Sequence, residues 1–350
     1  MARYQLRMYY QDGDKHTAGS KATLDCSNIL SSIGFKKVDL PIYAKRSYTG
    51  LNILYTVKTI FVLLLKMERG STLLIQYPLL GINKFLRPLA AGIKRMGCRS
   101  IVLIHDMDSL RQHGANKSIQ AEIDTLNTFD FVISHNKLMT AKLRAEGLCA
   151  QTVELDLFDY LFFDGVAVKD LDVKSRSVAF AGNLGKSGFL KHLKELHQVD
   201  FNLFGPGFAG EMSALNVKYE GSFPPEELPA MIPAGFGLIW DGDSILDCRG
   251  SKGEYLRYNN PHKASLYIVS GLPLIAPAES AIASLVKEKN IGLTVNSLFE
   301  LPALLEALSD DAYQDMYNNV QALKKTLSAG GNLVRVIHDL EYMHQLSKVL

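Results

Sequence analysis

The sequence predicts an α/β fold made of two Rossmann-like domains with a cleft between them. Short β-branched or leucine-rich runs alternate with helical segments, which is typical of parallel strands joined by crossover helices. A charged stretch at 156–176 interrupts this alternation, which then starts again. The length of 350 residues also suits two domains.

The first domain is expected over 1–160 and contains strand-like runs with helical segments between them. The expected strands are 4–9, 38–41, 72–77, 100–105, 129–134 and 152–155. The expected helices lie near 18–33, 51–67, 84–97, 119–127 and 136–146. Ser134 or Asn136 is expected to cap the last of these helices, since both are residue types that favour an N-cap.

The second domain is expected over 161–331 and repeats the same pattern. Its expected strands are 177–181, 200–204, 217–220, 236–240, 274–276 and 292–295. A final helix over 332–350 could cross back onto the first domain. Ligands of such sheets bind beyond the carboxyl ends of the strands, so polar loops that follow strands are the candidate sites.

The composition argues against several classes of protein. A net charge of +2 gives no strong field for nucleic acid. The four cysteines lie far apart without a CxxC pair, which disfavours a disulfide framework or a zinc site and fits a reducing cytoplasm. The N-terminus lacks the apolar core of a signal peptide, and the longest apolar run, 60–65, is too short to span a bilayer.

We therefore expect a cytoplasmic protein that at most rests on a membrane. The apolar segment 51–67 is first interpreted as a core helix. The alternative is a helix that lies in a lipid interface, because cationic residues stand at its margins.

The most informative segment is 255–275, which reads as loop, helix, tight turn and strand. Asn260 is expected as the N-cap and Pro261 as the first helical residue. Amide N–H groups at a helix start attract phosphate, and Lys263 adds a positive charge in the same turn. Tyr267 stands four residues later, on the same helix face. The pattern predicts a phosphate-bearing ligand at a sheet edge.

Three loops after strands of the second domain carry small or polar residues. The run 180–188 is rich in glycine but fits neither a Walker A loop nor GxGxxG. It predicts a ligand contact, with an ordinary strand–helix turn as the alternative. The turn 203–207 could admit a base or ribose, or be only a tight turn. Asp243 stands in a long loop, which is usually functional or mobile, with a solvated loop as the alternative.

Polar residues also follow strands of the first domain. The loop after the first strand contains Asp14 and His16. Asp106 lies just past a later strand, where a carboxylate could serve as the general base for an acceptor hydroxyl. Helix capping by Asp106 or Asp108 is the alternative, and His105 is more simply a buried structural histidine.

Together these residues resemble bacterial glycosyltransferases of the GT-B type. The segment 255–275, preceded by 238–243, is similar to the carboxyl-terminal domain of galactofuranosyltransferases from polysaccharide gene clusters. Related streptococcal glucosyltransferases that extend adhesin glycans share much of it. In the first domain, 105–111 and 19–22 are similar too. The likeness covers nearly the whole chain and is most specific over 236–276.

The resemblance implies a cytoplasmic hexosyltransferase with a UDP-sugar on the second domain and the acceptor on the first. The implied donor-binding residues are Gly182, Asn183, Gly205, Asp243, Tyr258, Asn259, Asn260, Lys263 and Tyr267. The implied acceptor-binding residues are Gly19, Ser20, Asp108 and Arg111. Such enzymes generally act without a bound metal or other cofactor, because amides and cations stabilise the leaving diphosphate.

The stereochemical expectation comes from a departure from the family pattern. Many retaining GT-B enzymes have two glutamates separated by seven residues. Here Lys287 stands where the partner of Glu279 would be, and Glu288 is one residue too far, so the pattern favours inversion. Inversion needs a general base. The candidates, in order of preference, are Asp106, His16 and Asp14.

The expected reaction transfers a hexose, galactofuranose, from a UDP-sugar to a hydroxyl of a glycan or lipid-linked glycan in polysaccharide synthesis of the O-antigen or capsule type. The alternatives are a UDP-glucose-dependent glucosyltransferase and a catalytically silent subunit that binds a nucleotide sugar. A nicotinamide-dependent oxidoreductase is disfavoured, because no GxGxxG with a downstream acid follows either first strand. No nucleic acid partner is expected, while self-association and peripheral membrane contact stay open.

Overall fold

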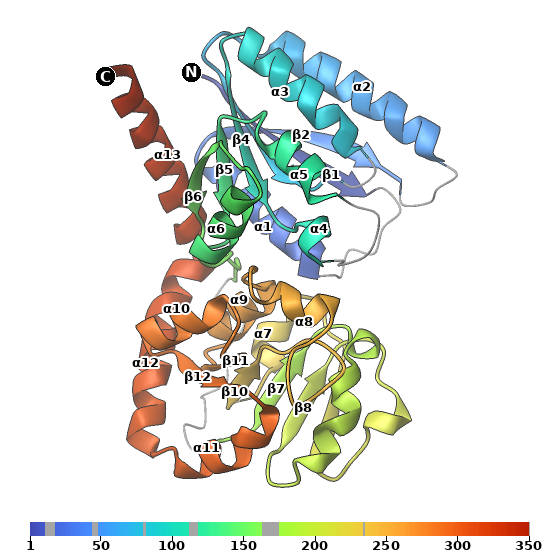
Figure 1. Cartoon of the computed structure of the whole chain (residues 1–350), viewed down its shortest axis with the longest axis vertical. Coiled ribbons are helices and arrows are strands. Elements are labelled where there is room, and N and C mark those ends of the chain that lie inside the picture. Colours follow the sequence, from blue (N-terminus) through green and yellow to red (C-terminus); the bar gives the residue numbers. More distant parts are fainter. Residues whose placement is uncertain are drawn as a thin grey trace. The chain divides into compact units, whose positions relative to one another are not determined.

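The structure is a computed structural model that describes residues 1–10, 18–43, 48–79, 82–111, 118–162, 175–233 and 235–349. It divides into two compact units, one made of Met1–Asp156 with Asn332–Leu350 and the other of Leu157–Gly331. Each unit contains a six-stranded sheet whose paired strands run parallel (Figure 1). The predicted α/β class with two Rossmann-like domains is thereby confirmed.

The sheet of the first unit has the strand order β2-β1-β3-β4-β5-β6. Its strands are β1 (Arg3–Tyr10), β2 (Phe35–Ile42), β3 (Thr72–Tyr77), β4 (Arg99–Ile104), β5 (Phe131–Ser134) and β6 (Gln151–Glu154). Its helices are α1 (Ala18–Ser32), α2 (Thr49–Lys66), α3 (Leu86–Arg95), α4 (Asp108–Arg111), α5 (Ile119–Leu126), α6 (Lys137–Ala145) and α13 (Gly331–Val349). Every residue of β3 is buried, as expected for a parallel strand covered on both faces.

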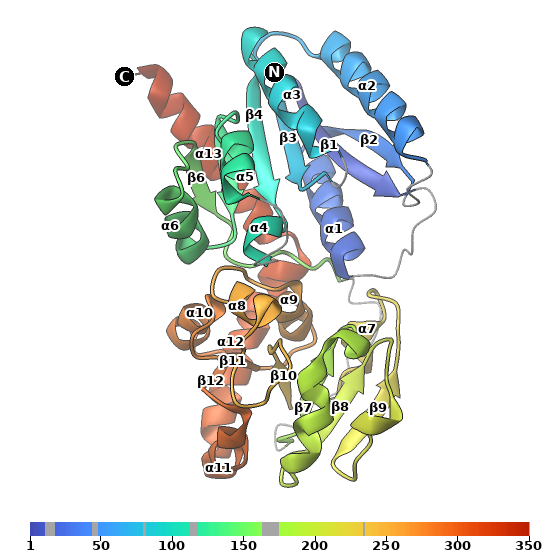
Figure 2. The ribbon, with the colours of Figure 1, turned by 45° about the vertical axis from the view of Figure 1, so that its right-hand side comes forward.

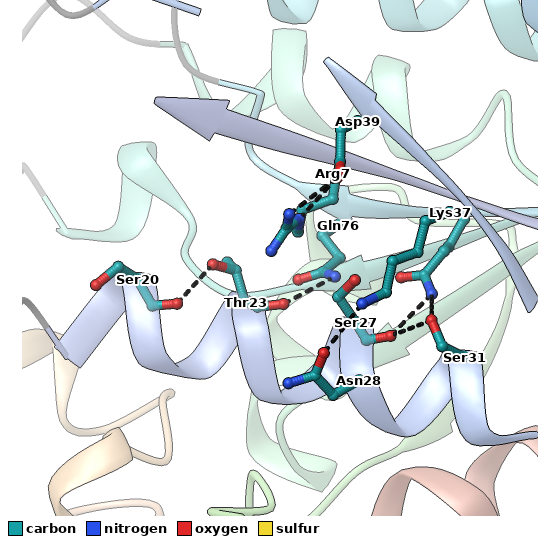
Figure 3. A network of polar contacts seen from close by, with 10 residues as sticks. Arg7, Ser20, Thr23, Ser27, Asn28, Ser31, Lys37, Asp39 and Gln76 are labelled. Carbon is teal, nitrogen blue, oxygen red and sulfur yellow. Dashed lines mark hydrogen bonds and ion pairs between the residues drawn. The ribbon is translucent and has the colours of Figure 1, made fainter. Parts of the chain in front are cut away.

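Helix α1 is fixed to the sheet by side-chain hydrogen bonds, most of which Figure 3 shows. The amide of Gln76 on β3 donates to the Thr23 carbonyl over 3.2 Å. The amide of Gln5 on β1 donates to the Ser27 carbonyl and to the Ser31 hydroxyl, both over 2.9 Å. These bonds to two neighbouring strands set the position of α1, whose first turn contains the candidate acceptor-binding residues Gly19 and Ser20.

Helix α13 contacts the first unit through Arg335, near its start, and Glu341, near its middle. Arg335 donates to the carbonyls of Glu154 and Leu155 and pairs with Asp156 at 3.2 Å. Arg3 at the start of β1 pairs with Glu341 over 2.9 Å. These contacts attach the end of the chain to β1 and to the segment just after β6.

The expectation of a core helix at 51–67 is wrong. In α2 only Thr56 and Leu63 are buried, and Phe61 and Leu65 are 61% and 71% exposed. Figure 2 shows α2 and α3 side by side, and the two helices contact one another. An apolar composition predicts burial, but a helix buries only the residues that face its neighbours.

The sheet of the second unit has the strand order β12-β11-β10-β7-β8-β9. Its strands are β7 (Val178–Ala181), β8 (Phe201–Phe204), β9 (Val217–Gly221), β10 (Phe236–Leu238), β11 (Leu274–Pro277) and β12 (Gly292–Val295). Its α-helices are α7 (Leu228–Met231), α8 (Ser251–Tyr255), α9 (His262–Val269), α10 (Ile282–Lys289), α11 (Leu301–Ala307) and α12 (Asp310–Ser328). Short 3₁₀ segments follow β7, at Leu184–Lys186 and Gly188–Glu195.

One aromatic side chain, Tyr267 of α9, packs directly against the central strand β10 of this second sheet. A Cβ at Gly237 in β10 would come within 2.1 Å of the Tyr267 ring on α9, so only glycine leaves room for that ring. Tyr267 is fully buried among the apolar residues of α9 and the sheet. This packing sets the distance between α9 and the strands, and so positions the start of α9.

Candidate functional site

The candidate donor site lies at the carboxyl ends of β10, β7 and β8, which are neighbours in the sheet. Gly182 and Asn183 follow β7, Gly205 follows β8, and Asp241 stands shortly after β10. Ligands of parallel α/β sheets bind at this edge. The loops predicted from sequence as donor contacts therefore come together at one edge.

Lys263 supplies the positive charge of this edge. Its Nζ donates to the Trp240 carbonyl over 3.3 Å and lies 3.8 Å from Asp241 Oδ2. The same ammonium lies 4.4 Å from the centroid of the Phe180 ring on β7. With its side chain 17% exposed, this cation is held by strand ends on one side and open to solvent on the other. It is well placed to meet an anionic ligand.

Cys248 shares this environment but is not a nucleophile. Burial raises the pKa of its thiol to about 12; a hydrogen bond with the backbone of Asp241 opposes the rise, and the negative charge of Asp241 adds to it. A thiol with such a pKa stays protonated at neutral pH, and the thiolate is the reactive form. Its side chain packs against the buried apolar residues of the second unit.

The loops after β7 and β8 approach each other too closely for side chains. Gly205 has a φ of +127°, and a Cβ there would lie 1.9 Å from the Gly182 carbonyl oxygen. The Leu184 N–H donates to the Pro206 carbonyl over 2.9 Å. Glycine at 205 is thus required by the packing of two backbone segments, whether or not a base or ribose binds beside it.

Tyr267 does not face the candidate ligand, in contrast to our expectation. Its hydroxyl accepts a hydrogen bond of 2.8 Å from the Ala181 N–H at the end of β7, and burial raises the pKa of that hydroxyl. Lys263 and Tyr267 are four residues apart, but the side chain of the former reaches outward and that of the latter is enclosed. Tyr267 therefore supports the strand end that carries Gly182.

The start of α9 also differs from the sequence expectation. Pro261, with φ −70° and ψ 142°, is the N-cap, and no side chain caps the helix. Asn260, the expected cap, is 4% exposed. Asn259 is half-buried, and its Oδ1 has no hydrogen-bond partner among the described residues. That oxygen is itself buried, while Tyr258 beside it is half-buried.

Two carboxylates of the loop after β10 are placed differently from what the sequence suggested. Asp243, the predicted one, is exposed and lies against Gly188, where a Cβ would come within 2.2 Å of its Oδ1. Asp241, two residues earlier in the same loop, is the carboxylate beside Lys263. Its position closer to the end of β10 is the signal that could have identified it.

In the first unit, Asp106 follows β4 and is ion-paired with Arg111 over 2.9 Å. Both side chains are partly exposed, at 36% and 50%. Asp108 is buried in the first turn of α4. His105 is half-buried, and its Nε2 lies 2.8 Å from Gln76 Oε1, in line with a structural histidine. The structure therefore brings together the predicted base and one predicted acceptor contact.

A buried carboxylate that the sequence reading missed holds this segment in place. Glu122 on α5 accepts hydrogen bonds from the Tyr77 hydroxyl over 2.6 Å, from the Ser109 N–H over 2.9 Å and from the Ser109 hydroxyl. Burial, together with this carboxylate, raises the pKa of Tyr77. An acid on the apolar face of a helix was the available signal. By binding both Tyr77 and Ser109, Glu122 fixes α4 next to the end of β3.

The remaining predicted residues divide into two groups. Asp14 and His16 lie outside the described residues. Gly19 and Ser20 stand in the first turn of α1. Asn136 caps α6 by accepting from the Met139 N–H over 2.9 Å, which confirms that prediction. Among the residues that the structure describes, no group of three or more His, Cys, Asp or Glu side chains is arranged to hold a metal ion.

Comparisons with known proteins agree with this arrangement. Residues 4–157 match the family model Glucosyltransferase 3-like, N-terminal domain, and residues 178–340 match its C-terminal domain. The β-1,6-galactofuranosyltransferase WbbI of Escherichia coli K12 is 32% identical over 339 residues, 93% of this chain and 96% of WbbI. Glucosyltransferase 3 of Streptococcus gordonii is 27% identical, over 77% and 79% of the two chains.

Solved structures share the architecture of the two sheets. HepE of Anabaena, in complex with UDP, matches with a TM-score of 0.60 and 14% identity, over 97% of this chain and all of HepE. At that identity the likeness shows the fold. Two parallel α/β domains of this kind, with relatives of known activity at higher identity, define a GT-B glycosyltransferase.

The chain belongs to the glucosyltransferase 3-like family, because the two family models together match most of its length. The resemblance expected from 236–276 is therefore confirmed. The roles of individual residues stay predictions.

Proposed function

We propose that the protein transfers galactofuranose from its UDP-sugar to a hydroxyl of a bacterial polysaccharide or its lipid-linked precursor. The observation that carries the donor assignment is Lys263, whose ammonium stands at the carboxyl edge of the second sheet beside Asp241. The sugar assignment is supported by the relative at 32% identity, which is a β-1,6-galactofuranosyltransferase. UDP itself is the ligand of HepE, whose structure has the same fold.

The chemistry would proceed by displacement at the anomeric carbon. The acceptor hydroxyl loses its proton to the base, its oxygen forms a bond to the anomeric carbon, and the bond to UDP breaks with the electron pair leaving on the diphosphate. Lys263 and the amides of the Gly182–Asn183 loop and of the α9 start would stabilise that charge. With these groups in place, we propose that the transfer needs no bound metal.

We propose inversion, with Asp106 as the base. This carboxylate follows β4, pairs with Arg111 over 2.9 Å, and remains partly exposed, so an acceptor hydroxyl can reach it. Gly19, Ser20, Asp108 and Arg111 would shape the acceptor site around it. Asp106→Asn should lower kcat strongly while leaving UDP affinity unchanged, and an active variant would return the role of base to Asp14 or His16.

Glu279, which follows β11, is relevant to whether the transfer inverts or retains the anomeric configuration. Glu279 is 72% exposed and ion-paired with Arg257, and Lys287 stands at the place of the second glutamate of many retaining GT-B enzymes. Proton NMR of the product distinguishes inversion from retention through the anomeric configuration. A product with the configuration of the donor would contradict inversion.

A second donor has its own support. The S. gordonii relative is a glucosyltransferase and covers 77% of this chain at 27% identity. UDP-glucose is therefore the alternative donor. A catalytically silent subunit that binds a nucleotide sugar is the alternative without turnover. We place the reaction in the cytoplasm, where nucleotide sugars are available.

A donor screen tests these proposals together. The protein is incubated with UDP-galactofuranose, UDP-galactose, UDP-glucose or UDP-N-acetylglucosamine and a panel of sugar acceptors, and released UDP is measured. We expect release with UDP-galactofuranose, equally in EDTA and in Mg²⁺. Lys263→Ala should abolish release, whereas Lys289→Ala, an exposed lysine at the end of α10 on the opposite edge of the sheet, should not. Release only from UDP-glucose would replace the donor, and none with any donor would favour the silent subunit.

A further inference from the structure

Helix α2 presents an apolar face to solvent. It spans Thr49–Lys66, and only two of its residues are buried. The exposed large apolar side chains of α2 are Leu54, Val57, Phe61, Val62 and Leu65. Spacings of three and four residues put most of them on one side of the helix. An exposed apolar stripe of this kind on a helix surface marks an interaction site.

The charge around this face is mostly positive, although Glu68, just after the helix, is exposed. The segment 48–67 contains no acidic residue, and Lys58 and Lys66 are exposed on the helix itself. The adjoining helix α3 exposes Lys94 and Arg95 in its last turn. Lysine side chains can cover apolar surface with their methylene stems while their charges stay in water. An apolar stripe that carries cations, with further cations on the adjoining helix, is complementary to anionic lipid headgroups.

Aromatic side chains stand at the start of the helix. Tyr48 is 40% exposed, and its ring centroid lies 4.9 Å from that of Tyr43. Tyr55 lies in the next turns, with its ring stacked 6.4 Å from the same Tyr43. Tyrosine is enriched where membrane meets water because one end of the ring is apolar and the other carries a hydroxyl.

The helix is attached to the sheet, so it would lie along a membrane. The Asn52 side chain donates to the Tyr43 carbonyl and accepts from the Tyr43 N–H, both over 2.9 Å. Leu63 is buried beneath the helix. By length and composition α2 is the one helix of the described residues that could cross a bilayer. Its fixed inner face and its mid-helix Lys58 favour an orientation parallel to the surface.

We propose that α2, with the exposed side of α3, docks the protein on an anionic bilayer. A second copy of the chain is the competing occupant. Interfaces between proteins are depleted of lysine, whereas this face carries lysines at its middle and its end. The proposal does not depend on the sugar or nucleotide that the enzyme uses, so it can fail or hold independently of the proposed function.

The test is flotation of the full chain with vesicles of phosphatidylcholine alone or mixed in equal parts with phosphatidylglycerol. We expect flotation with the mixed vesicles at low salt, less at high salt, and little with phosphatidylcholine alone. Phe61→Asp and Leu65→Asp should each reduce the floated fraction by about tenfold. The matched control is Leu215→Asp, which changes a fully exposed leucine of the second unit and should float as the parent does.

Two further measurements make the outcome decisive. All substituted side chains are exposed, so each variant should fold. Circular dichroism and UDP binding check this. Light scattering gives the mass of each protein without lipid. Failure of the parent to float with anionic vesicles would overturn the proposal. So would a parent dimer that becomes a monomer in Phe61→Asp while flotation is unchanged.

Discussion

The hydroxyl of Tyr267 should contribute both to the free energy of unfolding and to the affinity for the UDP donor. It accepts the Ala181 N–H over 2.8 Å inside a fully buried environment. Tyr267→Phe keeps the ring that packs against Gly237 and removes only the acceptor, which leaves a buried N–H without a partner. Such an orphaned donor costs about 1–3 kcal/mol. For a unit of this size that corresponds to a fall in Tm of about 2–4 °C per kcal/mol.

The effect on UDP follows from where the bond lies. Ala181 is the last residue of β7 and directly precedes Gly182 and Asn183. A loosened strand end should widen the loop and raise the Kd for UDP, measured by isothermal titration calorimetry, by about threefold or more. A change of threefold corresponds to about 0.6 kcal/mol, a part of the stability loss.

The matched control is Tyr313→Phe. Its hydroxyl is also buried and donates to the Gly235 carbonyl over 2.9 Å, but at the amino end of β10, on the far edge of the sheet. We expect a similar fall in Tm and no change in UDP affinity. If Tyr267→Phe matched the parent in both quantities, or if both variants weakened UDP equally, the supporting role of Tyr267 would be refuted.

Three other predictions follow from buried or crowded positions. Gly205→Ala puts a Cβ 1.9 Å from a carbonyl oxygen at φ +127° and should cost more than about 2 kcal/mol by urea denaturation, whereas Gly210→Ala, with nothing within 4 Å, should be nearly neutral. Burial lowers the pKa of His135 from 6.5 to about 4, so the unfolded chain binds a proton that the folded chain refuses. The free energy of unfolding should therefore fall by up to about 3 kcal/mol as pH drops from 6.5 to 4, and His135→Gln should flatten this slope. Glu122→Gln replaces one accepting carboxylate oxygen with an NH₂ group, which faces the donors of Tyr77 or Ser109. The variant should have a lower Tm and a higher KM for the acceptor. An unchanged KM would show that this hydrogen-bond network does not support the acceptor site.

The strands and most helices were predictable because their signals are local. Each expected strand of either domain is present, with ends that differ by a few residues. The run 236–240 ends as a strand at Leu238, although the Ile239 N–H still donates to Ile275. A cap at Ser134 or Asn136 was predictable because the capping bond is local, and it is Asn136 whose side chain accepts from the Met139 N–H.

The side chains of the site were less predictable because their directions depend on tertiary packing. The spacing of Lys263 and Tyr267 shows that they share a side of α9, but not that a gap at Gly237 draws the tyrosine ring inward. The sequence likewise does not show which carboxylate of the loop after β10, Asp241 or Asp243, lies beside Lys263. The exposure of α2 also depends on which neighbours cover it, and no pattern of apolar residues within the helix contains that information.

The central claim is that a UDP-sugar binds with its diphosphate at Lys263. Crystals of the full chain soaked in UDP test this most directly. We expect the diphosphate within hydrogen-bond distance of Lys263 Nζ and of the amides that follow β7, with the Asp241 carboxylate displaced from its 3.8 Å approach to the lysine. A nucleotide bound elsewhere, with Lys263 still directed at the Trp240 carbonyl, would contradict the account.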